Sequence, residues 1–225
     1  MQQLPLDLVA IDAFSRDRFV ESGSVRPVLD ALLHPNTWLA PHLLITGPEG
    51  SGKTHLGHIF AKTHGAVFVG SADSAALQIA PGQSYVIDDA DSASEETLFH
   101  LFNTVQASGG YLVLLSRVHP LQWAVTLPDW QSRLRAMRLV TLPEPDDDLL
   151  EAILSTLFAQ RAISPSTDAV AYIASRADRS VAALQKIVTE LEHYANGRAF
   201  TRGLARDFFE HSQTLPFDET ESDSR

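Results

Sequence analysis

Residues 47–54 read Gly-Pro-Glu-Gly-Ser-Gly-Lys-Thr, and this stretch decides the fold. It matches the pattern G-x-x-x-x-G-K-[ST] of a phosphate-binding loop, and it stands between the apolar run Leu43–Ile45 and a helix expected to begin near Lys53. Its glycines let the backbone N–H groups of a tight loop turn inward around an anion. A chance glycine-rich turn is the alternative, but the full pattern in a strand–loop–helix context favours a nucleotide site.

Each part of this loop has an expected role. Lys53 would supply a positive charge to the β- and γ-phosphates, Thr54 would bring a hydroxyl to Mg²⁺, and the following helix would direct its N-terminus at the same oxygens. The residues predicted to bind ADP or ATP within this segment are Gly47, Pro48, Glu49, Gly50, Ser51, Gly52, Lys53, Thr54 and His55.

A second motif supplies carboxylates. The apolar segment Tyr85–Asp88 reads as a short buried strand, so its last residue would lie beside Thr54 and share the Mg²⁺. Asp89 would then polarise the water that attacks the terminal phosphate. A strand end followed by a solvated acidic turn is the alternative reading, and the phosphate loop upstream favours the metal site.

Composition limits the class of protein. A chain of 225 residues with 44% hydrophobic residues suits one α/β domain and a small satellite. It has no cysteine, which excludes disulfides and thiolate metal sites. The N-terminus lacks the features of an export signal and no apolar run is long enough to span a membrane, so we expect a cytoplasmic protein that does not bind membranes.

The net charge of −11 disfavours strong non-specific attraction to DNA. Arg133, Arg135 and Arg138 cluster after Trp130, and they are suited to serve a phosphate on a neighbouring subunit, including a second copy of this chain.

The hydrophobic pattern alternates between strands and helices before residue 143. The predicted strands are 43–46, 66–70, 85–88, 111–116 and 139–142, and the clearest helices are 25–33, 53–64 and 95–107. The fold class is therefore α/β, with a five-stranded, mainly parallel sheet covered by helices. After Pro143 only helical periodicity remains, over 147–161, 166–175, 180–195 and 201–211, which predicts an all-α lid that begins with an N-cap in Pro145–Asp148.

Four parts follow from this pattern. We predict an N-terminal tail over residues 1–13, an α/β core over 14–143, a helical lid over 144–212, and an acidic disordered tail over 213–225.

A phosphate-loop sheet followed by a helical lid resembles the AAA+ ATPases. The segments Gly52–Leu56 (GKTHL) and Ile87–Asp89 are similar to those of the DnaA/Hda family, and the resemblance covers residues 14–211. It implies that Arg133, in the segment QSRL, acts as an arginine finger on a neighbour's nucleotide. It also implies that Arg179 senses the nucleotide of its own chain.

The residues leave other readings open. Arg133 would also suit a surface or interdomain salt bridge, and Arg179 would also suit a pair with Asp178. The Ser116-Arg117 step stands where the family has its sensor-1 residue, and Ser116 is the candidate for it, but this chain departs from the many relatives that carry an acidic residue in that turn.

The N-terminal tail carries a further motif. Gln3, Leu4, Leu6 and Leu8 resemble the hexapeptide that binds the replicative sliding clamp, since an extended segment places the three leucines on one side and the glutamine at the edge of a groove. An edge strand packed on the body is the alternative.

The DnaA initiator carries a C-terminal helix-turn-helix domain that is not found here, so an origin-recognising initiator is not expected. The resemblance implies a regulator that holds ADP or ATP and docks on the sliding clamp, the β subunit of DNA polymerase III. It would reach DNA only through the clamp and promote hydrolysis of DnaA-bound ATP. Two alternatives are a helicase loader or remodelling ATPase that hydrolyses its own ATP, and a non-catalytic clamp adaptor stabilised by nucleotide.

Overall fold

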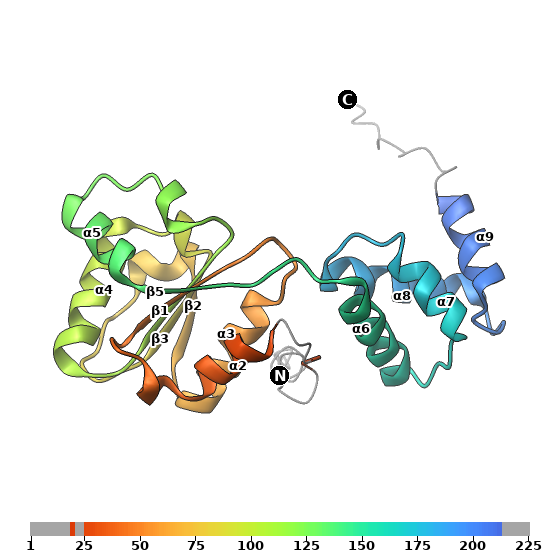
Figure 1. Cartoon of the computed structure of the whole chain (residues 1–225), viewed down its shortest axis with the longest axis horizontal. Coiled ribbons are helices and arrows are strands. Elements are labelled where there is room, and N and C mark those ends of the chain that lie inside the picture. The colour runs from red at the N-terminus through yellow and green to blue at the C-terminus, as the bar shows by residue number, and fades with distance from the viewer. Residues whose placement is uncertain (1–18, 21–24, 213–225) are drawn as a thin grey trace, which may run out of the picture. The chain divides into compact units, whose positions relative to one another are not determined.

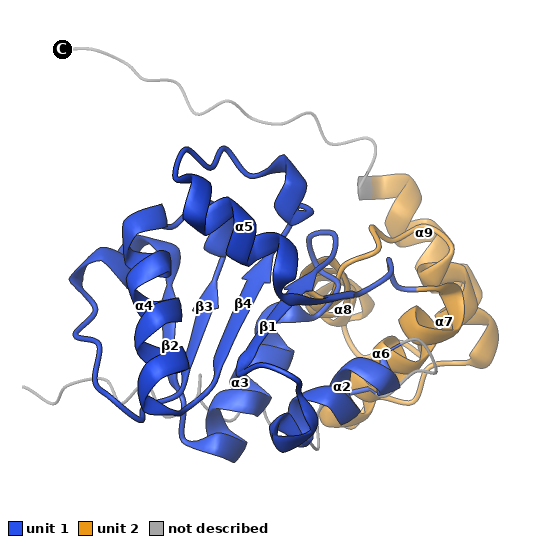
Figure 2. Cartoon of the chain, turned by 60° about the vertical axis from the view of Figure 1, so that its left-hand side comes forward, with its two compact units in different colours: residues 1–145 blue, residues 146–225 orange. Residues whose placement is uncertain are grey.

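The computed structural model of the chain describes residues 19–20 and 25–212. The chain divides into two compact units, residues 1–145 and 146–225, close to the predicted domain boundary after residue 143 (Figures 1 and 2). The tail motif at Gln3–Leu8 and the acidic tail over 213–225 lie outside the described residues.

The first unit is built on a five-stranded sheet in which every described pairing is parallel. The strand order is β2-β3-β4-β1-β5, with β1 (His42–Thr46), β2 (Val67–Gly70), β3 (Tyr85–Asp88), β4 (Leu112–Ser116) and β5 (Arg138–Thr141). The predicted α/β fold class is confirmed. The sequence reads as strands here because β1 and β4 are buried along their whole length, as parallel strands covered on both faces are.

Helices cover both faces of this sheet (Figure 2). Helices α4 (Glu95–Ser108) and α5 (Pro128–Ala136) pack on one face, in a core that includes Leu44, Ile87 and Leu114 from three neighbouring strands. Helix α3 (Lys53–His64) packs against β2, β3 and β4, and α2 (Arg26–Leu33) packs against α3.

Helix α5 was not predicted from the sequence. Only Trp130 and Leu134, one helical turn apart, are buried in it, and most of its other residues are polar. Such a short apolar stripe gives a weak periodic signal. The helix begins at Pro128, where the missing N–H of proline costs nothing because the first turn has no acceptor for it.

The second unit is a bundle of four described helices, α6 (Asp147–Gln160), α7 (Thr167–Ala174), α8 (Val181–Ala195) and α9 (Arg202–Ser212). The Asp146 carboxylate accepts a hydrogen bond from the Leu149 N–H at 2.9 Å, which confirms the predicted N-cap. Leu150, Leu154, Leu184 and Val188 are among the side chains of its core. None of the helices in the described residues is long and apolar enough to cross a membrane.

One buried ionisable residue sits at the start of β1. The His42 ring stacks on Phe102 at 3.6 Å between centroids, and its Nε2 is 3.2 Å from the Phe102 carbonyl oxygen. Burial lowers the pKa of His42 from 6.5 to about 4. The folded protein therefore keeps His42 neutral down to a lower pH than the unfolded chain does. Between pH 6.5 and about 4, the unfolded chain binds a proton at this residue more readily than the folded protein.

This shift makes stability depend on pH. The contribution of neutral His42 to the free energy of unfolding is fully present above pH 6.5, and it is lost as the pH falls toward about 4. A pKa shift from 6.5 to about 4 corresponds to about 3 kcal/mol in the free energy of unfolding once the pH has fallen below both values. Urea denaturation of His42→Gln between pH 7.5 and 4.5 should show a correspondingly smaller loss of unfolding free energy than the parent. The exposed His100→Gln change on α4 is the control, and equal losses in the parent and His42→Gln would contradict the assignment.

Candidate nucleotide-binding site

The phosphate loop joins the end of β1 to the start of α3. Gly52 has φ of 92°, a left-handed conformation that side chains rarely adopt, and it directly precedes the helix. A Cβ at Gly47 would lie 2.8 Å from the Leu142 carbonyl oxygen and 2.9 Å from Ser51 Oγ. The loop is thus held tightly against Leu142, the residue that follows β5, and both glycines are required by its shape.

Lys53 lies inside this loop. Its ammonium donates hydrogen bonds to the carbonyl oxygens of Gly47 at 2.8 Å and Pro48 at 2.7 Å, and only 7% of the residue is exposed. Burial lowers the pKa of Lys53, and the Asp88 carboxylate acts in the opposite direction. A cation at this depth is placed to attract an anion held by the loop.

The structure brings together the two predicted metal ligands. The Thr54 hydroxyl donates to Asp88 Oδ2 at 2.8 Å, although the two residues come from α3 and the end of β3. Asp88 Oδ1 accepts from the Asp89 N–H at 3.1 Å. A hydroxyl and a carboxylate in contact at the edge of a phosphate loop form the oxygen pair that Mg²⁺ uses with nucleotides.

Two further observations test whether the residues present fit a nucleotide phosphate. Ser51 Oγ is buried and has no hydrogen-bond partner among the described residues. The close approach around Gly47 leaves no room for a side chain on the loop backbone. The loop geometry, the buried cation and the oxygen pair together fit the phosphates of a nucleotide with Mg²⁺.

Sequence reasoning gave no role to Arg117, which follows β4. Its Nε donates to Asp89 Oδ1 at 3.0 Å, and Nη1 lies 3.3 Å from Glu49 Oε2 in the phosphate loop. The hydrogen bond to Asp89 and the charge of that carboxylate raise the pKa of Arg117. The signal in the sequence was its position, directly after a buried strand and in the turn where relatives carry an acidic residue.

Ser116, the predicted sensor, is fully buried. Its hydroxyl donates to the Val118 carbonyl oxygen at 2.7 Å and accepts from the indole N–H of Trp123 at 3.2 Å. These bonds fix the turn after β4. The hydroxyl thus helps to hold the neighbouring Arg117 in place, and the role of Ser116 as a nucleotide sensor remains a prediction.

Arg133 lies on α5, where its guanidinium sits over the rings of Phe99 and Phe102 at 5.3 and 5.0 Å from their centroids. It is half-buried, while Arg135 and Arg138 are exposed. None of the three has an ion-pair partner within the described residues. Within the described part of the chain, Arg133 therefore does not form the salt bridge that was the alternative interpretation of this residue.

Arg179 belongs to the second unit. Its Nη2 lies 2.6 Å from Asp147 Oδ1 at the start of α6, and its side chain is 41% exposed. Asp147 is therefore a carboxylate partner of Arg179, and the pairing with Asp178 that the sequence left open stays a prediction. The role of Arg179 as a nucleotide sensor remains a prediction.

His55, the residue that follows Thr54, packs against an aromatic ring. The His55 ring meets Phe19 edge-on at 5.0 Å between centroids, beside the loop.

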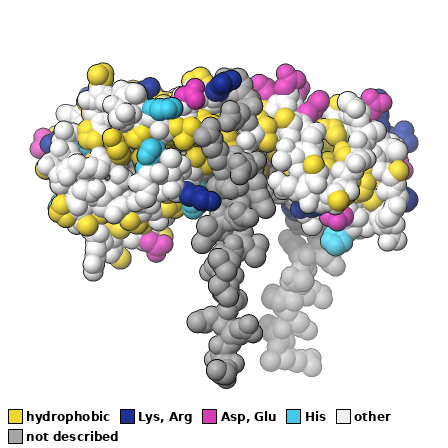
Figure 3. Space-filling model, turned by 90° about the horizontal axis from the view of Figure 1, so that it is seen from below, with side chains coloured by type: hydrophobic (Ala, Val, Ile, Leu, Met, Phe, Trp, Pro, Cys, Tyr) yellow, Lys and Arg dark blue, Asp and Glu magenta, His cyan; other side chains and the backbone are white. Residues whose placement is uncertain are grey.

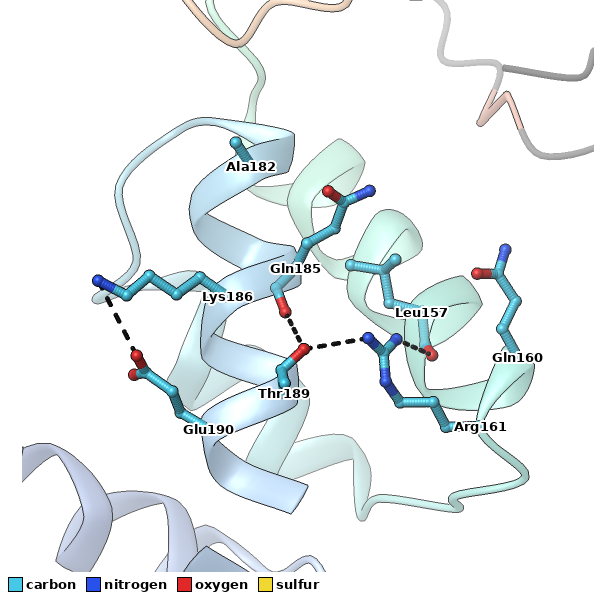
Figure 4. Close-up of a pocket in the computed structure, with 8 residues that line it drawn as sticks. All are labelled: Leu157, Gln160, Arg161, Ala182, Gln185, Lys186, Thr189 and Glu190. Atoms are coloured by element: carbon cyan, nitrogen blue, oxygen red, sulfur yellow. Dashed lines mark hydrogen bonds and ion pairs between the residues drawn. The ribbon is translucent and has the colours of Figure 1, made fainter. Parts of the chain in front are cut away.

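Figure 3 shows basic and acidic side chains interspersed on the visible face, without a continuous basic area over the described residues. On the second unit, a hollow between α6 and α8 is lined by charged groups already bonded within the chain, such as Arg161 to Thr189 and Lys186 to Glu190 (Figure 4).

Solved structures share this architecture. Domain III of DnaA from Thermotoga maritima has a TM-score of 0.74 and 17% identity, covering 88% of this chain and 96% of that domain. The Thermotoga maritima RuvB Holliday junction branch migration motor has a TM-score of 0.70 and 19% identity over 89% of this chain and 72% of that one. AMPPCP-bound DnaA from Aquifex aeolicus has a TM-score of 0.70 and 20% identity, covering 89% and 70%. The chain therefore has a DnaA-like AAA+ fold.

A relative in sequence gives the family. An uncharacterized protein of Haemophilus influenzae is 30% identical over 198 residues, which cover 80% of this chain and 85% of that protein. The chain belongs to the same family as that Haemophilus protein. No protein-family model matches the sequence.

Substitution of Lys53, which carries the buried ammonium, is the most direct test of the site. Lys53→Ala should weaken binding of ADP and ATP at least about tenfold, because hydrogen bonds to charged groups contribute about 1.5–3 kcal/mol. Isothermal titration calorimetry with Mg²⁺ measures this. Lys62→Ala, an exposed change in the last turn of the same helix, is the matched control, and a folded Lys53→Ala protein with unchanged affinity would rule the site out.

Proposed function

We propose that this chain is a nucleotide-dependent regulator of replication initiation, of the type represented by Hda. It binds ADP or ATP with Mg²⁺ at the loop of residues 47–54, docks on the sliding clamp, and promotes hydrolysis of DnaA-bound ATP. The observation that carries the nucleotide part is the Thr54–Asp88 contact beside the buried Lys53, on a DnaA-like fold.

The chain's own residues would divide the work at the loop. The backbone N–H groups of the loop and Lys53 would hold the phosphates, and Thr54 and Asp88 would hold Mg²⁺, which would supply positive charge at the terminal phosphates. Asp89 directs a water molecule. Such a site organises the surface that meets DnaA, whether or not the chain hydrolyses its own nucleotide.

The DnaA-directed part of the proposal rests on Arg133. Phosphoryl transfer spreads negative charge over the equatorial oxygens, and a guanidinium brought from a neighbouring subunit stabilises that charge. Arg133 has no carboxylate partner within the described residues, so its charge is not neutralised there. Phe99 and Phe102 hold the guanidinium without removing its N–H donors, since a ring contacts only its face.

The clamp part of the proposal rests on the sequence of the tail. Gln3, Leu4, Leu6 and Leu8 offer alternate apolar side chains and one amide to an elongated groove. Because the overall charge of −11 disfavours direct binding to DNA, a clamp on DNA would bring the protein to its site of action.

A second candidate is an ATPase that hydrolyses its own ATP, as a helicase loader or remodelling factor does. The intact set of Lys53, Thr54, Asp88 and Asp89 favours it, together with the fold shared with the RuvB motor. A non-catalytic clamp adaptor is the third. These candidates differ in what Arg133 does.

Arg133→Ala should abolish the stimulation of DnaA ATP hydrolysis, a loss of about 10³-fold or more, while clamp binding is kept. The assay measures phosphate release from DnaA-bound ATP with the loaded clamp present. Arg135→Ala and Arg138→Ala are matched changes in the same basic segment and show whether a neighbouring arginine acts instead.

The other outcomes select another candidate. If Arg133→Ala leaves stimulation unchanged and neither neighbour matters, the trans-acting role fails. If the parent protein gives no stimulation but hydrolyses ATP in an oligomer-dependent way that Arg133→Ala removes, the self-hydrolysing ATPase takes its place.

The tail motif makes an independent prediction. The double change Gln3→Ala with Leu4→Ala should remove the complex with the sliding clamp, seen by size-exclusion chromatography, without altering the thermal transition. Gln213→Ala with Leu215→Ala, a looser glutamine and leucine pair near the other end, is the control. Parent protein that forms no complex with and without ADP would exclude the clamp-bound regulator.

A further inference from the structure

The sheet topology puts the residue after β4 in a particular place. Because β4 lies between β1 and β3 in the strand order, the chain leaving β4 emerges between the phosphate loop and the carboxylates that follow β3. Arg117 is the first residue after β4. Its side chain therefore starts between the two halves of the candidate nucleotide site.

The contacts of Arg117 join these halves. Nε and Nη2 lie 3.0 and 3.4 Å from the two carboxylate oxygens of Asp89. Nη1 lies 3.3 Å from Glu49 of the phosphate loop. The backbone N–H of Arg117 donates to Asp91 Oδ1 at 3.3 Å, which fixes the start of the side chain. One guanidinium thus bridges the loop and the residue expected to direct water.

This bridge can be exchanged. The Arg117 side chain is 51% exposed and that of Glu49 is 80% exposed, and ion pairs in water contribute little to stability. A phosphate offers more negative charge and matches the planar fork of the guanidinium in the same way as a carboxylate does. A terminal phosphate between the loop and Asp89 would compete directly for the same N–H donors.

We propose that Arg117 is a positioning residue that holds Asp89 in an ion pair bridged to Glu49 and exchanges this pair for the terminal phosphate of a nucleoside triphosphate. The proposal rests on nucleotide binding at the loop, the first part of the proposed function. A diphosphate ends one phosphate earlier and leaves the bridge in place, so Arg117 distinguishes ATP from ADP and releases Asp89 only when ATP is bound.

The turn that carries Arg117 is built to support this role. Ser116 is fully buried, and its hydroxyl is bonded to the backbone of Val118 and the indole of Trp123. The backbone of the turn is therefore fixed while the guanidinium beyond it is exposed. A fixed base with an exchangeable tip suits a residue that changes partners.

The test compares the affinities of the folded full-length protein for ADP and for a non-hydrolysable ATP analogue, both with Mg²⁺. Arg117→Ala should weaken binding of the analogue by about 10- to 100-fold, the cost of losing charge-assisted hydrogen bonds, and change ADP binding little. Arg117→Lys should restore part of the preference, since an ammonium keeps the charge without the fork. Arg206→Ala is the control, an exposed arginine on α9 that pairs with Asp207 and Glu210.

A second arm examines the bridge itself. Glu49→Gln removes one competitor for the guanidinium, so the analogue should bind more tightly than to the parent. Because this gain acts through Arg117, it should disappear when Glu49→Gln is combined with Arg117→Ala, a non-additivity that a double-mutant cycle measures.

The outcomes separate this proposal from the proposed function. Equal weakening of ADP and analogue in Arg117→Ala, or a Glu49→Gln gain that persists without Arg117, would mean that Arg117 is only structural and would overturn the proposal while leaving nucleotide binding intact. A parent protein that binds neither nucleotide would remove both.

Discussion

The hydrogen bond between Thr54 and Asp88 is the contact on which the site depends. It joins the helix that follows the phosphate loop to the end of β3, and its 2.8 Å length requires β1, β4 and β3 to end at one edge of the sheet. That alignment follows from the parallel register, in which Thr46 pairs with Ser116 and Ile87 pairs with Leu114. The fully buried aliphatic strands hold the register, so the hydrophobic core sets the geometry of the polar edge.

The charges at this edge are arranged in layers. Lys53 lies deep, closed on the carbonyl oxygens of its own loop, while Arg117 lies at the exposed rim between Glu49 and Asp89. In the proposed function, Lys53 serves the β-phosphate, which ADP and ATP share, as well as the γ-phosphate. In the proposal for Arg117, the outer cation lies where the two nucleotides differ, so binding and discrimination would fall to different residues.

The strands, the loop and the Thr54–Asp88 pair could be predicted because each has a local signal: an apolar run, a glycine pattern, or a carboxylate after a buried strand. Helix α5 lacked such a signal, since only Trp130 and Leu134 of it are buried. Arg117 was missed for another reason. Its partners are distant in sequence and meet it only because β4 inserts between β3 and β1, and strand order is not written in local periodicity. Asp147, a partner of Arg179, likewise comes from α6, and α7 lies between the two residues in the sequence.

The most direct test of the account is a crystal structure of the protein grown with Mg²⁺ and a non-hydrolysable ATP analogue. We predict phosphates within the loop of residues 47–54, Mg²⁺ between Thr54 and Asp88, and the Arg117 guanidinium on the terminal phosphate with Asp89 released. A saturated crystal with an empty loop, or with nucleotide bound elsewhere, would contradict the central claim that this edge of the sheet is a nucleotide site.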